Sequence, residues 1–199
     1  MTSEVGTEDF ESYNWDDSDL DIDFPGAGTA SLFGDGQVYS TEAVPGADLD
    51  KIQQELNTGR YAVSGIKYFQ ARANVGVSSG FSIEMSEEVA AFGFYAYDLG
   101  DFGGNLEIRL YNDGELVGTI SNSDHNLYEV RSSGYTSGSA LYVGIIGELK
   151  TDGTHETFDR VEFVIENQDG SNYDEFGLDD MTIATADQII NQSVVLYAD

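Results

Sequence analysis

The chain has 199 residues, a length typical of one domain that buries a core without covalent staples. It contains no cysteine, which excludes disulfides, thiolate metal sites and a cysteine nucleophile. Only 8 basic residues stand against 37 acidic ones, for a formal net charge of −29. Such a surface repels nucleic acid and anionic membranes, because both require cationic contacts.

The N-terminal residues are polar and contain neither the basic segment nor the apolar run of a secretory signal peptide. No apolar stretch elsewhere approaches the roughly 20 residues that a membrane helix needs. We therefore expect no membrane insertion, and we expect residues 1–8 to form an N-terminal arm.

One short helix is expected at Asp48–Asn57. Asp48 is the predicted N-cap, and the apolar spacing places Leu49, Ile52 and Leu56 on one helix face. No other segment gives a comparable helical signal, so the fold class must come from strands.

Alternating apolar and polar residues dominate from about residue 66 onward, which indicates strands. Asn112-Asp113-Gly114 predicts a hairpin turn, since residues of this kind tolerate positive φ. The run Leu141–Ile146 is apolar throughout and predicts a buried central strand. The expected strands are Lys67–Ala73, Phe81–Met85, Val89–Tyr97, Leu106–Leu110, Leu116–Ile120, Leu141–Ile146, Val161–Ile165 and Phe176–Ile183.

This spacing of short strands and turns predicts an all-β fold, an antiparallel jelly-roll β-sandwich with at most one or two short helices, over residues 9–185. Residues 186–199 form an apolar C-terminal extension. It is either one more strand or edge cover, or a segment that docks on a partner or a second copy by strand addition. The docking candidates are Ile189, Ile190, Val194, Val195 and Leu196.

Acidic residues gather near both ends of the predicted sandwich, around Asp9 and Glu11 and around Asp179 and Asp180. Alternation turns one carboxylate of the adjacent Asp179–Asp180 pair toward the interior side or an edge, and a buried charge without a partner is expensive. Ca²⁺ takes carboxylate oxygens readily, and the chain has few basic residues to pair instead. We therefore predict a structural Ca²⁺ site that joins the two clusters; the alternative is a set of solvated acidic turns.

Two short motifs near the ends of the chain, Asp9-Phe-Glu11 with Trp15 and Gly177-Leu-Asp-Asp-Met181, resemble those of MAM-like and PEP-CTERM-type extracellular jelly rolls. The order of the intervening strand motifs is similar too. The resemblance implies a lectin-like β-sandwich used for binding or adhesion, whose first and last strands pair beside a cation. It assigns that cation first to Glu11 and Asp180, then to Asp9 and Asp179.

Those modules usually carry an export signal, and none is recognisable in this sequence: either the protein stays where it is made, which we favour, or a signal has been removed. A jelly roll made without one is familiar among virus and phage structural proteins. Our principal prediction is therefore a non-catalytic structural accessory protein on a virion surface, such as a phage head decoration, spike or tail appendage. The alternative is a carbohydrate-binding or adhesion module that is extracellular or on a cell surface.

Catalysis is not expected. The carboxylates of Asp19, Asp21 and Asp23 alternate on one strand face, but a glycosidase cleft of that type is lined by several Trp and the chain has one. Several aromatic residues, Tyr95 and Tyr142 among them, could stack on a sugar ring, although core and cross-strand packing is the favoured role of strand aromatics. For glycan contact we select Tyr128 and Tyr135, which lie in a polar loop region.

Overall fold

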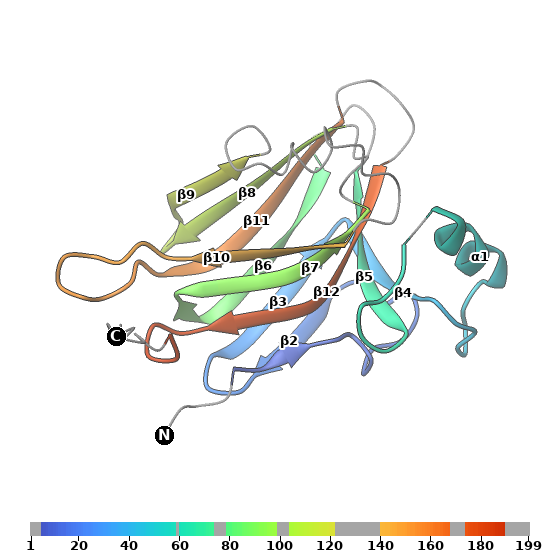
Figure 1. Ribbon diagram of the computed structural model, residues 1–199, viewed down its shortest axis with the longest axis horizontal. Coiled ribbons are helices and arrows are strands. Elements are labelled where there is room, and N and C mark those ends of the chain that lie inside the picture. Colours follow the sequence, from blue (N-terminus) through green and yellow to red (C-terminus); the bar gives the residue numbers. More distant parts are fainter. Residues whose placement is uncertain are drawn as a thin grey trace, which may run out of the picture.

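Two antiparallel sheets packed face to face form the body of the protein (Figure 1). The computed structural model describes residues 5–58, 60–73, 79–98, 104–121, 140–167 and 174–189. Over these residues the chain forms two six-stranded sheets and one helix. The predicted fold class, an all-β jelly-roll β-sandwich with one or two short helices, is confirmed.

The first sheet, here called sheet A, has the strand order β10-β7-β12-β5-β4, with β1 also paired to β12. Its strands are β1 (Thr7–Glu8), β4 (Gly36–Ser40), β5 (Lys67–Ala73), β7 (Ala91–Tyr97), β10 (Ala140–Ile146) and β12 (Asp174–Ala184). β1 pairs Thr7 with Thr182 and Glu8 with Met181, so the first and last strands lie side by side as predicted.

The second sheet, here called sheet B, has the order β2-β3-β6-β11-β8-β9. Its strands are β2 (Leu20–Phe24), β3 (Gly28–Gly34), β6 (Ser79–Val89), β8 (Gly104–Asn112), β9 (Glu115–Ser121) and β11 (Phe158–Asn167). The hairpin between β8 and β9 turns at Asp113 and Gly114, with φ values of 48° and 78°. Both are positive, as a type I′ turn requires, and the hairpin prediction is confirmed.

Aromatic side chains from both sheets fill the space between them. The ring of Phe163 on β11 stacks on Phe81 of β6 at 4.3 Å between centroids. It meets Phe94 of β7 edge-on at 5.5 Å and lies 6.4 Å from Phe176 of β12. All four side chains are buried. Aromatic pairs of this kind contribute about 0.5–1.5 kcal/mol each beyond their buried area, so this cluster holds sheet A on sheet B.

The helix α1 (Leu49–Thr58) lies beside β4 and β5 of sheet A (Figure 1). The carboxylate of Asp48 accepts hydrogen bonds from the amides of Asp50 and Lys51 at 3.0 and 3.3 Å, so the predicted N-cap is confirmed. The predicted apolar face is wrong. Leu49 and Leu56 are exposed, whereas Ile52 and Glu55 are buried. Ile52 packs with a cluster of Trp15, Tyr39 and Tyr68, and this contact sets the helix rotation.

The prediction of a buried central strand at Leu141–Ile146 is also wrong. Among the strands that the structure describes, β10 pairs only with β7 and lies at the edge of sheet A. Its outward-facing residues Tyr142, Gly144 and Ile146 are exposed, because no described element covers this part of the sheet. β3 and β4 were not expected, since their glycine and serine residues interrupt the apolar alternation. No helix among the described residues is long and apolar enough to span a membrane.

Replacing Asp48 by alanine is predicted to lower the free energy of unfolding by about 1 kcal/mol, because two amides of the first helical turn lose their acceptor. Urea denaturation measures the loss. The control is Gln53→Ala at an exposed position inside the same helix, where we expect little change. Equal stability of D48A and the wild type would contradict the capping role.

Candidate functional site

A loop spanning residues 60–67 crosses the outer face of sheet A and is held there by carboxylates from distant strands. Asp179 on β12 is fully buried. One of its oxygens accepts hydrogen bonds from the amides of Val63 at 2.7 Å and Ser64 at 3.2 Å. Its other oxygen accepts the amide of Asp180 at 2.8 Å. Backbone donors thus partner a carboxylate that the loop buries on the outer face of sheet A.

Glu11 forms hydrogen bonds with the other end of the same loop. Its carboxylate accepts the amides of Ile66 and Lys67, both at 2.6 Å. The Lys67 ammonium donates in return to the backbone carbonyls of Glu11 and Tyr13 at 2.8 and 2.6 Å. Gly65 has φ +59°, and a Cβ there would collide with the Glu11 carboxylate. The loop therefore needs glycine at this position.

The structure brings the two predicted acidic clusters to one loop. Asp180, at φ 47° in an irregular part of β12, accepts the hydroxyl of Ser64 at 2.6 Å. Asp9 is exposed and accepts the amide of Glu11 at 3.1 Å. Among the described residues, no three or more His, Asp or Glu side chains form a group that could hold a metal ion. The Ca²⁺ site stays a prediction.

Burial gives Asp179 an unusual titration. Burial raises the pKa of Asp179 to about 7, although three backbone amides that donate to the carboxylate oppose the shift. Asp180 adds to the rise through charge repulsion. The ionised form is therefore disfavoured in the folded protein relative to the unfolded chain.

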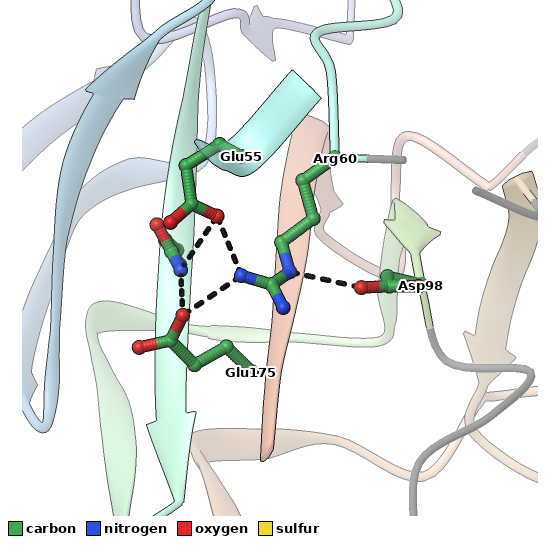
Figure 2. Close-up of polar contacts among 5 residues, drawn as sticks. Glu55, Arg60, Asp98 and Glu175 are labelled. Atoms are coloured by element: carbon green, nitrogen blue, oxygen red, sulfur yellow. Dashed lines mark hydrogen bonds and ion pairs between the residues drawn. The ribbon is translucent and has the colours of Figure 1, made fainter. Parts of the chain in front are cut away.

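A second polar cluster lies where the loop begins, between α1 and the end of β7 (Figure 2). Arg60 forms ion pairs with Glu55 at 2.5 Å, Glu175 at 2.8 Å and Asp98 at 2.9 Å. Gln70 on β5 donates to Glu55 at 3.2 Å and also to Glu175. One guanidinium thus joins the helix, the loop, β7 and β12.

This cluster is structural rather than a binding site. Burial alone would lower the pKa of Arg60, but attraction to Glu55, Glu175 and Asp98 outweighs burial and raises it. Burial also raises the pKa of Glu55, even with Arg60 beside it. The Arg60 side chain is 12% exposed and already engaged on three sides. It fixes α1 and the loop to sheet A.

Beside the loop, a row of tyrosines runs over β7 and β10 on the outer face of sheet A. Tyr61 of the loop packs on Tyr97 with ring centroids 4.9 Å apart. Two residues earlier on β7, Tyr95 meets Tyr142 of β10 at 5.1 Å in an edge-on arrangement. The two ends of the row reach solvent, since Tyr61 is 39% and Tyr142 52% exposed.

Tyr142 lies across two glycines that face each other on neighbouring strands. Gly144 and Gly93 are register partners. A Cβ on Gly93 would collide with the Tyr142 hydroxyl, and one on Gly144 would lie 3.2 Å from the ring. A hollow of about 230 Å³ adjoins the ring and has an apolar lining that includes Val5, Ile146 and Ala184. Glycine at both positions thus lets an exposed aromatic ring lie close to the sheet.

Most of the other residues predicted to contact a glycan or a partner lie outside the part of the chain that the structure describes. Tyr128 and Tyr135 lie outside the described residues, as do Ile190, Val194, Val195 and Leu196. Ile189 is half-buried after β12, where neighbouring Gln188 donates to the carbonyl of Pro25 at 3.0 Å. Tyr142 packs across strands on Tyr95, as expected of a strand aromatic, and about half of its side chain is exposed. Two glycines on paired strands, a signal visible only once the register is known, place it on the surface.

The fold is similar to those of known β-sandwich domains. It matches the K2 cleaved adhesin domain of Lys-gingipain with a TM-score of 0.51 and 14% identity, over 92% of this chain and 100% of that one. A family 29 carbohydrate-binding module mutant matches with a TM-score of 0.40 and 13% identity, over 94% and 98% of the two chains. The TmCBM61 module in complex with β-1,4-galactotriose gives 0.39 and 12%, over 78% and 88%.

At 14% identity, the likeness to the adhesin domain shows the β-sandwich fold alone. No family model matches the sequence, and no curated protein matches it either.

The raised pKa of Asp179 predicts a pH dependence of stability. Between about pH 4, where Asp179 titrates in the unfolded chain, and pH 7, the unfolded state binds fewer protons than the folded state. The contribution of Asp179 to the free energy of unfolding therefore falls as the pH rises through this window. Urea denaturation across pH 4–8 should show a shallower decline for Asp179→Asn than for the wild type.

The control for this series is Asp35→Asn, which removes an exposed carboxylate. Its stability profile should run parallel to the wild-type profile. Parallel profiles for Asp179→Asn and the wild type would contradict the shifted titration of Asp179.

Proposed function

We propose that the chain is a non-catalytic carbohydrate-binding or adhesion module, acting outside the cell or on a surface, whose ligand lies along the tyrosine row of sheet A. The observation that carries the proposal is the half-exposed ring of Tyr142, which lies close over Gly93 and Gly144. Covering an exposed aromatic surface of this kind with a ligand is favourable, because it removes apolar area from water.

The chemistry of the row suits a sugar. One face of a pyranose ring carries C–H groups that pack on an aromatic ring, and its hydroxyls need polar partners at the edge. The Tyr142 ring offers the apolar face, and its hydroxyl and that of Thr182 lie beside Gly93. Apolar surface with a few placed polar groups is the usual composition of a small-ligand site.

Tyr61 extends the site beyond one sugar unit. It occupies the far end of the row, and the loop that carries it is anchored by Glu11 and Asp179. The span from Tyr142 to Tyr61 therefore fits an oligosaccharide lying along β7. The fold is similar to that of an adhesin domain, and this similarity of architecture supports the same class of function. No described feature favours the virion appendage, which stays a prediction from the sequence.

Replacing Tyr142 by alanine is predicted to weaken glycan binding at least tenfold, because the stacking surface is removed. Tyr142→Phe keeps the ring and should retain most of the affinity. The measurement is a printed array of neutral oligosaccharides, including mannohexaose, β-1,4-galactotriose and cellohexaose, followed by calorimetric titration of the glycans that bind.

Leu116→Ala is the matched control, since it trims an equally exposed side chain from sheet B. It should bind like the wild type. Wild-type binding by Y142A, or a wild-type protein that binds no glycan on the array, would refute the proposal.

We also propose, from the sequence, that Ca²⁺ stabilises the paired ends of the sandwich through Glu11 and Asp180, with Asp9 and Asp179 beside them. Adding EDTA to the purified protein should then lower its melting temperature, and Asp180→Ala should remove this sensitivity. An unchanged melting curve on addition of EDTA would refute the calcium site. That outcome leaves the amide contacts of Glu11 and Asp179 intact.

A further inference from the structure

The outer face of sheet B, on the opposite side of the sandwich from Tyr142, carries a connected set of polar side chains. On β8 and β11, Arg109 faces Glu162 and Tyr111 faces Arg160 in register. The Tyr111 hydroxyl donates to the Glu162 carboxylate at 3.0 Å, and Arg109 lies 3.6 Å from the same oxygen. The Arg160 guanidinium stacks 4.0 Å from the centroid of the Tyr111 ring.

Two hollows open on this polar set. One, of about 320 Å³, is lined by Gly80, Ser82, Arg109, Glu162 and Val164, together with backbone at Phe81 and Phe163. The hollow exists because Ser82 has a small side chain and Gly80 has none. Gly80 also packs tightly, since a Cβ at this position would collide with the Phe163 carbonyl. The other, of about 310 Å³, is lined by Glu84, Met85, Asp113, Gly114, Asp159 and Arg160.

Charge balance indicates the kind of ligand. Arg109 and Arg160 are two of only 8 basic residues in the chain, yet they share this face with Glu84, Glu107 and Glu162. The face therefore has no excess positive charge with which to select an anion. It offers fixed guanidinium donors beside fixed carboxylate acceptors. Alternating donors and acceptors of this kind match the hydroxyls of a neutral, hydroxyl-rich molecule.

We propose that the outer face of sheet B is a second ligand site, which binds a neutral saccharide through Arg109 and Glu162 in the larger hollow. The Arg109 side chain is 36% and the Glu162 side chain 29% exposed, so both can contact a ligand while Glu107 and Tyr111 hold them in place. This site recognises hydroxyls by hydrogen bonding, whereas the tyrosine row recognises a ring face by stacking.

Two sites on opposite faces make one module bivalent. A single chain could then bridge two glycan strands, and binding to a dense glycan surface would gain avidity without any new contact. The second site stands on its own contacts, so it does not depend on ligand binding by the tyrosine row.

The test compares Arg109→Met, Glu162→Gln, Tyr142→Ala and the wild type on one array of neutral, sulfated and sialylated oligosaccharides. Arg109→Met keeps the aliphatic stem and removes the donors, and Arg109→Lys keeps the charge and donors on a single ammonium group but loses the planar guanidinium. We expect R109M and E162Q to lose at least tenfold in binding to a set of neutral glycans that Y142A still binds. R109K should recover part of that binding.

The outcomes separate the two sites. If R109M and E162Q, both with wild-type melting temperatures, match the wild type on every glycan, the second site is refuted. Loss confined to sulfated or sialylated glycans would refute a neutral ligand. If R109M loses binding while Y142A loses none, the tyrosine row is wrong and the second site stands. A wild-type protein that binds nothing refutes both.

Discussion

The arrangement of sheet A depends on two carboxylates that accept backbone amides. A chain with 37 acidic and 8 basic residues has few cations with which to pair its buried carboxylates. Glu11 and Asp179 instead take four amides of the loop spanning residues 60–67, and they draw that loop over the outer face of the sheet. Arg60 fixes its start through three carboxylates. The loop covers part of the outer face of sheet A. It does not cover the Gly93–Gly144 pair, over which the Tyr142 ring lies.

Much of the fold follows from the sequence because alternation and turn chemistry are local properties. The hairpin at Asp113–Gly114 and the cap at Asp48 were predicted correctly for this reason. Which face of an element is buried depends on distant partners. Leu141–Ile146 is as apolar as a central strand but ends a sheet, and α1 turns Glu55 inward because Arg60 lies there. The position of a strand in its sheet and the distant partner of a helix residue both depend on tertiary structure, so the local sequence pattern predicts neither.

The candidate site was predicted in part. The sequence placed Glu11 and Asp179 near each other, since motifs at the two ends of the chain suggested paired first and last strands. Their partners are backbone amides. Almost every residue type carries a backbone amide, so the sequence does not indicate these partners, and a cation was expected instead. Tyr142 was ranked below Tyr128 and Tyr135 as a glycan contact, because its exposure depends on the register that sets Gly93 opposite Gly144. Sheet B poses the same problem, as Arg109 and Glu162 meet only across β8 and β11.

Amide hydrogen exchange in the native protein tests the capture of the loop most directly. The account predicts that the amides of Val63, Ser64, Ile66 and Lys67 exchange slowly in the wild type, since each donates to a carboxylate. Glu11→Ala should speed exchange at Ile66 and Lys67, and Asp179→Ala at Val63 and Ser64, with the Phe163 core still protected. Exchange at the rates of an unstructured peptide for these four amides in the wild type would contradict the account.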